Sequence, residues 1–159
     1  MKLCKICINS DMFCSACAKG VESGVIKKVD VELSRALYKV SKESGYDIDF
    51  LETAESNGKL FVVVPSAYAA RFIGPGGRTI KKLAEAVGKP IKMLEKAEGS
   101  EKHVIEKLIA AQIIGINKVY SAGGESTKVR IDRRYMKNVQ PLSDIAGRVL
   151  GRKISFVFE

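Results

Sequence analysis

The sequence contains no tryptophan, only one histidine and four prolines among its 159 residues, and no long uninterrupted apolar run. A membrane-spanning helix needs about 20 consecutive apolar residues, so no membrane partner is expected. The first 17 residues lack the apolar core of a secretory signal, which favours a cytoplasmic location. With His103 as the sole imidazole, no nucleophile–base pair can be assembled, and we expect no enzymatic activity.

Positive charge is in excess, with 27 Lys and Arg against 18 Asp and Glu and a formal net charge of +9. The excess lies in two blocks: residues 65–93 carry six bases and one acid, and residues 126–159 carry eight bases and three acids. A charge that serves only solubility tends to be spread evenly, whereas clustered positive charge indicates a polyanionic partner. Nucleic acid is the commonest such partner, and no small-molecule substrate is expected.

All four cysteines lie within the first 17 residues, as two Cys-x-x-Cys pairs separated by six residues. Two such pairs can face each other and present four thiolates in the tetrahedral arrangement that Zn²⁺ prefers. A disulfide pair would imply an oxidising compartment, and a redox Cys-x-x-Cys usually lies in a βαβ unit; the sequence indicates neither. We therefore predict one structural zinc ion with no open ligand position. Its predicted ligands are Cys4, Cys7, Cys14 and Cys17.

After the cysteines, the sequence repeats one order of elements: a helix, a hairpin of two strands, two helices and a last strand. In the first pass Asp30 is expected to cap the helix, and Asn57-Gly58 is a strong hairpin turn signal. In the second pass Ser100 is the helix cap and Gly123-Gly124 the hairpin turn. The sequence therefore predicts an α+β fold. Its three predicted segments are residues 1–29, 30–97 and 98–159.

The most informative stretch is Ile73-Gly74-Pro75-Gly76-Gly77-Arg78-Thr79-Ile80, in which three glycines in four residues separate two short helices. Backbone without side chains lets a phosphodiester approach closely, and the N–H groups and helix dipole favour its negative charge. No G-x-G-x-x-G pattern or βαβ unit accompanies the loop, so a dinucleotide site is not indicated. The residues predicted to bind RNA are Arg71, Ile73, Gly74, Pro75, Gly76, Gly77, Arg78, Lys81 and Lys82.

This loop resembles the GxxG loop of KH domains, which clamps about four backbone nucleotides. The order of elements over residues 30–97 is similar to that of type II KH domains. The third segment resembles a degenerate KH domain, because Val139-Gln140-Pro141 stands where the loop would be. Its basic residues are expected either to hold RNA backbone or to form a solvated surface. They are Arg133, Arg134, Lys137, Arg148, Arg152 and Lys153.

A four-cysteine knuckle, a KH domain and a degenerate KH domain in tandem resemble the small archaeal NusA-like proteins, and the resemblance covers nearly the whole chain. It implies single-stranded RNA binding linked to transcription elongation or termination. The polymerase-binding and S1 domains of bacterial NusA have no counterpart here, so any contact with RNA polymerase would fall to the zinc knuckle. The alternative is an adaptor whose knuckle docks onto RNA polymerase or an RNA-processing complex, with RNA contact secondary.

The remaining polar and aromatic residues are expected at surface or core positions without a catalytic role. Four acidic residues in a predicted strand over residues 46–55 are expected on a solvated face rather than as paired catalytic carboxylates. His103 is expected on a helix surface. Tyr68 lies near the glycine loop, and the sequence is equally compatible with a role in lining the groove and a role in core packing. The four acids are Asp47, Asp49, Glu52 and Glu55.

Overall fold

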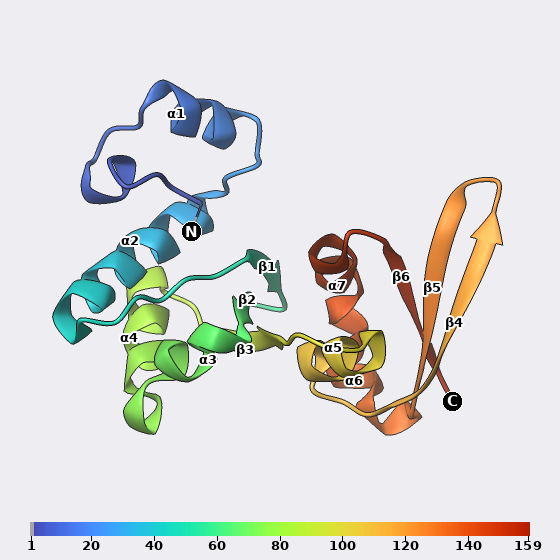
Figure 1. Cartoon of the computed structure of the whole chain (residues 1–159). Helices are drawn as coiled ribbons and strands as arrows, with labels where there is room; N and C mark the ends of the chain where they lie inside the picture. The colour runs from blue at the N-terminus through green and yellow to red at the C-terminus, as the bar shows by residue number, and fades with distance from the viewer. Residues whose placement is uncertain (1) are drawn as a thin grey trace. The chain divides into compact units, whose positions relative to one another are not determined.

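A computed structural model describes residues 2–159 of the chain. The structure is a mixed α+β arrangement with two three-stranded sheets (Figure 1). It divides into two compact units, the first ending at Met93 and the second running from Leu94 to Glu159. Over residues 2–159, no helix is both long enough and apolar enough to span a bilayer.

The first unit begins with a small N-terminal knuckle, residues 2–27, that packs on a long helix. The knuckle contains a 3₁₀ turn η1 (Cys7–Asn9) and a helix α1 (Ser15–Glu22), and the long helix α2 (Lys28–Ser44) follows. One apolar cluster joins the knuckle to α2 and supplies its small core. The cluster comprises Leu3, Cys7, Ile8, Cys17 and Ile26 of the knuckle, with Val31 of α2 and the partly buried Val21 and Tyr38.

Helix α2 starts earlier than the sequence predicted, and Asp30 is not its cap. Lys27 occupies the cap position, and Asp30 lies in the first turn with its side chain fully buried. The Asp30 carboxylate accepts a hydrogen bond from the Lys27 N–H at 2.9 Å and another from the hydroxyl of Thr53. The physical reason is that Val29 belongs to the core stripe of α2 and must already be helical to face the sheet.

The rest of the first unit is a sheet in the order β1-β2-β3 covered by helices. Strand β2 is central, and its apolar run Leu60–Val64 is buried throughout. Helices α2 and α4 pack side by side over the core (Figure 1). The predicted hairpin turn is confirmed, because Asn57 and Gly58 have φ of 52° and 74° between paired Ser56 and Lys59. The elements are β1 (Glu52–Ser56), β2 (Lys59–Pro65), α3 (Ser66–Ile73), η2 (Pro75–Gly77), α4 (Arg78–Val87) and β3 (Ile91–Lys96).

The second unit has the same order of elements, as the repeated sequence pattern predicted. Its sheet order is β4-β5-β6; β4 and β5 form a long antiparallel hairpin, and β6 runs parallel to β5 (Figure 1). Ser100 caps the first helix as predicted, accepting a hydrogen bond from the His103 N–H at 3.4 Å. The elements are α5 (Glu101–Ile109), β4 (Ile113–Ser121), β5 (Gly124–Ile131), η3 (Arg133–Tyr135), α6 (Met136–Val139), η4 (Gln140–Leu142), α7 (Ser143–Leu150) and β6 (Lys153–Phe158).

Candidate metal centre and nucleic-acid interface

The four cysteine sulfurs of the knuckle lie within 4.8 Å of one another. Cys4 and Cys7 come from the chain around η1, while Cys14 caps α1 and Cys17 lies in its first turn. Cys4 Sγ lies 3.9 Å from Cys14 Sγ. Sulfurs bound tetrahedrally at about 2.3 Å from one ion are about 3.8 Å apart, so the four thiolates could hold a metal ion. Such a set suits zinc but is equally compatible with iron.

Backbone N–H groups point at the sulfurs and divide them into two kinds. The Cys7 N–H donates to Cys4 Sγ at 3.5 Å and lowers the pKa of Cys4 to about 6. The Cys17 N–H likewise lowers the pKa of the exposed Cys14. The Cys14 N–H donates to Cys7 Sγ at 3.0 Å, but burial and the neighbouring thiols outweigh this bond and raise the pKa of Cys7 to about 12. A bound cation would therefore be needed to hold all four groups as thiolates together.

The loop between α3 and α4 presents the bare backbone that its glycines predicted. Gly74, Gly76 and Gly77 have φ of 74°, 60° and 73°, in the left-handed region that favours glycine. A Cβ on Gly74 would overlap the side chain of Thr79, whereas one on Gly76 would meet open space. The Gly77 N–H donates to the Gly74 carbonyl at 3.1 Å and closes the turn directly before α4. The loop therefore exposes backbone at the N-terminus of that helix.

A groove of about 590 Å³ runs beside this loop. One wall comes from the end of α2 and the chain after it, including Tyr46 and Ile48, and the other from α3 and the loop, including Arg71 and Pro75. The Arg71 guanidinium lies 5.6 Å from the centre of the Tyr46 ring and donates to the Asp47 carbonyl at 3.3 Å. The groove thus combines apolar walls, a cation and an exposed ring, which are the features of single-strand binding sites.

The predicted RNA-binding residues divide between this groove and the start of α4. Arg71, Gly74 and Pro75 line the groove. Arg78, Lys81 and Lys82 are exposed on α4, where the Lys82 amine lies 3.6 Å from a Glu43 carboxylate oxygen. Ile73 is 39% exposed, and Gly76 is exposed at the loop tip. The structure therefore brings the predicted residues to one side of the first unit, around a single loop.

Tyr46 is the groove residue that sequence reasoning missed. Tyr68, which the sequence placed nearest the loop, packs against the core of the first unit instead. Tyr46 is 60% exposed and follows Gly45, which ends α2 in a left-handed conformation with φ of 74°. That turn directs the chain back beside α3, where Arg71 lies. Tyr46 and Arg71 are far apart in sequence, and no local pattern connects them.

The prediction that the four acids share one strand face is wrong. Asp47 and Asp49 precede the sheet, and only Glu52 and Glu55 lie on β1. The Glu52 carboxylate lies 3.6 Å from the amine of Lys2, and the Glu55 carboxylate lies 2.7 Å from that of Lys89. The reason is that residues 45–50 run alongside the core before any neighbouring strand is available for pairing.

The second unit passes from α6 to α7 without a left-handed turn. Val139, Gln140 and Leu142 have φ of −99°, −52° and −92°, all in the right-handed region, so the backbone is not bared as in the first unit. Among the basic residues predicted to contact RNA there, the Arg152 guanidinium lies 2.5 Å from a Glu101 carboxylate oxygen, and the Arg134 guanidinium lies 3.3 Å from an Asp132 carboxylate oxygen. The others predicted there are Arg133 on η3, Lys137 on α6, Arg148 on α7 and Lys153 on β6.

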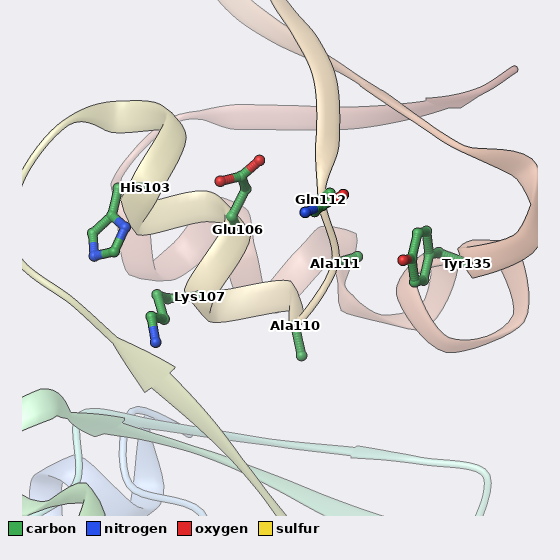
Figure 2. A pocket seen from close by; sticks show the side chains of 7 residues that line it. All are labelled: His103, Glu106, Lys107, Ala110, Ala111, Gln112 and Tyr135. Carbon is green, nitrogen blue, oxygen red and sulfur yellow. The ribbon is translucent and has the colours of Figure 1, made fainter.

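Figure 2 shows a hollow of about 410 Å³ on the second unit, between α5 and η3. His103 and Lys107 lie on its α5 wall, and the Tyr135 ring lies on the opposite side. His103 is exposed, as expected. Glu106 also lines the hollow, but its carboxylate accepts the Ile113 N–H at 3.0 Å and so holds the start of β4. This hollow is therefore secondary to the groove of the first unit as a candidate site.

No family model and no curated protein matches the chain. Among solved structures, one named "Crystal structure of APE1850" is similar, with a TM-score of 0.59 and 24% sequence identity. The match covers 77% of this chain and 96% of that chain. At this identity the similarity shows the fold alone: the architecture of nearly all of that protein is present here.

Proposed function

We propose that this protein is a non-enzymatic RNA-binding factor of the archaeal NusA-like type, built from two tandem type II KH domains of which the second lacks the clamp. The order of helices and strands in both units supports this assignment. The observation that carries the proposal is the three-glycine turn before α4, with its positive φ angles and open approach at Gly76.

In the proposed complex, an RNA phosphate rests on the glycine loop, where backbone N–H groups and the α4 dipole favour negative charge. Basic side chains around the loop neutralise the flanking phosphates, and unstacked bases lie in the apolar groove beside Tyr46. Duplex RNA does not present its bases in this way, so single strands are preferred. The basic side chains are Arg71, Arg78, Lys81 and Lys82.

We further propose that the knuckle holds one structural Zn²⁺ through Cys4, Cys7, Cys14 and Cys17. Four thiolates fill a tetrahedral shell, which leaves no open position for a water or substrate. The ion therefore supports folding of the knuckle rather than chemistry.

The cellular role proposed from the NusA-like resemblance is in transcription elongation or termination. A second candidate is an adaptor that docks onto RNA polymerase or an RNA-processing complex through the knuckle. The specific observation in its favour is the exposed apolar surface of the knuckle, where Ile6, Met12 and Val25 are 76%, 79% and 67% exposed.

The test replaces Pro75 and Gly76 with Asp in the full chain and measures single-stranded RNA binding by fluorescence anisotropy. Two carboxylates at the loop tip repel the phosphate, so affinity should fall at least ~10-fold, or about 1.4 kcal/mol. A matched control, Ala122→Asp with Gly123→Asp, makes the same charge change at the exposed β4–β5 turn. A folded loop variant that binds RNA within about twofold of the unmodified protein would overturn the proposal.

A further inference from the structure

We infer that single-stranded RNA continues from the glycine-loop groove across α2 to the cysteine knuckle, so that the first unit binds a longer strand than a GxxG loop alone. A GxxG loop clamps about four nucleotides. This inference rests on the proposed function and extends the same site. It assigns binding contacts to Lys39 and Lys42, which lie outside the loop and its groove.

Three hollows of the first unit lie along α2 and the chain that follows it. The groove beside the loop includes Tyr46. The next hollow, of about 490 Å³, starts at the adjacent residue Asp47 and extends past Lys42 and Tyr38 to the knuckle. The third, of about 310 Å³, shares Tyr38 and Lys42 with the second and reaches the turn at Ser10. A strand leaving the groove therefore has a recessed route along α2.

Each part of this path pairs a cation with an aromatic ring. Single-strand binding sites combine cations for the phosphates with flat rings on which bases stack, and cation–π contacts hold the two kinds of group together. The repetition of the pairing along the path indicates one kind of ligand for all three hollows. The pairs in the lining are Arg71 over Tyr46 at 5.6 Å and Lys42 over Tyr38 at 4.7 Å from the ring centre, and the second pair lines two of the hollows. Arg35 of the third hollow lies 5.4 Å from the centre of the Phe13 ring, which is outside the lining.

Helix α2 supplies one face of the path through residues spaced at three and four positions. Arg35, Tyr38, Lys39 and Lys42 are neighbours on that face because of this spacing. Arg35 also donates from Nη2 to the Ser10 carbonyl at 2.7 Å, which joins the knuckle to the helix. Lys39 and Lys42 are exposed and present their ammonium groups to the path.

The charge along the path fits a polyanion. Five basic residues line the three hollows against two acids, Asp11 and Asp47. The cysteines, all within the described chain, lie outside the lining of these hollows, so a thiolate centre does not face the path. The exposed Tyr46 ring beside Arg71 favours RNA, which offers both bases and phosphates, over an acidic protein. The five basic residues are Lys5, Arg35, Lys39, Lys42 and Arg71.

The experiment titrates the full chain with labelled random-sequence RNAs of about five and about twelve nucleotides; the shorter RNA fills little more than the clamp, which takes about four nucleotides. The unmodified protein should bind the longer RNA more tightly. Lys39→Glu with Lys42→Glu should remove two phosphate contacts, each of which contributes about 0.7 to the slope of log affinity against log salt concentration. Binding of the longer RNA should therefore weaken about 25-fold at ~0.1 M salt, taking 1 M salt as the reference. Binding of the shorter RNA should stay within about twofold.

A matched control, Lys59→Glu with Lys92→Glu, makes the same charge reversal at exposed positions off the path. It should change the affinities for the shorter and the longer RNA by the same factor. Equal losses of affinity for both RNAs in the α2 variant would overturn the inference. The lysines would then act only through the long-range attraction between the protein's positive charge and RNA. An α2 variant that binds the longer RNA normally would also overturn it and would leave this face to a protein partner. The proposed function fails separately, if the Pro75→Asp, Gly76→Asp variant still binds the shorter RNA normally.

Discussion

At the scale of single residues, Tyr46 gives the groove its only exposed ring among the described lining residues. Base–aromatic stacking contributes about 1–3 kcal/mol per base, so Tyr46→Ala should weaken single-stranded RNA binding at least ~5-fold. Tyr46→Phe keeps the ring and should bind within about twofold of the unmodified protein. Anisotropy titrations of both variants check this. An Ala variant that binds normally would remove Tyr46 from the site.

In metal-free protein, the cysteine side chains should differ in reactivity for as long as the knuckle keeps its fold. Cys4 is exposed and its pKa is lowered to about 6, so it is largely thiolate at neutral pH, whereas Cys7 is buried and its pKa is raised to about 12. The thiolate is the nucleophile, so alkylation by iodoacetamide should modify Cys4 and Cys14 before Cys7 and Cys17. The rate at Cys4 should decline as pH falls through about 6. Mass spectrometry after a short exposure to the reagent, before the knuckle unfolds, measures the order, and earlier labelling of Cys7 and Cys17 would contradict it.

At the scale of elements, Asp30 links the start of α2 to β1. Its buried carboxylate accepts from the Lys27 N–H and from the Thr53 hydroxyl, and the Lys27 amine donates to the Thr53 carbonyl. Asp30→Ala should lower the free energy of unfolding by about 2–3 kcal/mol, because it leaves buried donors without an acceptor. Urea denaturation measures this. Glu32→Ala removes a less buried acid from the same helix and should cost less than ~0.5 kcal/mol.

Most helices and strands follow from local sequence patterns, and the predictions that differ from the structure do so for physical reasons. The predicted strand over residues 46–55 is only partly present, although Ile48 and Phe50 within it are buried, both at most 3% exposed. Residues 46–50 form no strand because pairing requires a neighbour, and the chain first meets β2 where the Leu51 N–H donates to the Val63 carbonyl. Helix α5 stops at Ile109 because Ala110 adopts a left-handed φ of 53°. Propensity alone does not reveal that position.

At the scale of the whole molecule, repetition in the sequence predicted two α+β units after the cysteines, and the structure has two units with the same element order. The glycine loop was predictable because its three glycines fall within four consecutive residues and serve a local backbone geometry. The groove beside it was predictable only in part, because Tyr46 reaches it through the tertiary packing of α2 against α4. The path along α2 depends on how the knuckle packs, and the sequence contains no signal for that.

Removal of a metal from the cysteines should affect the knuckle and leave the second unit unchanged. The cluster that joins the knuckle to the chain extends no further than Tyr38, so loss of a metal at the cysteines should release the knuckle and loosen the first turns of α2. Hydrogen exchange measured by mass spectrometry after chelation should show lost protection over residues 2–27 and in the N-terminal half of α2. Protection over β4, β5 and β6 should be unchanged, because the second unit is a separate compact body. Uniform loss of protection would show that the two units unfold together. Unchanged protection in the knuckle would show that the four cysteines hold no structural metal.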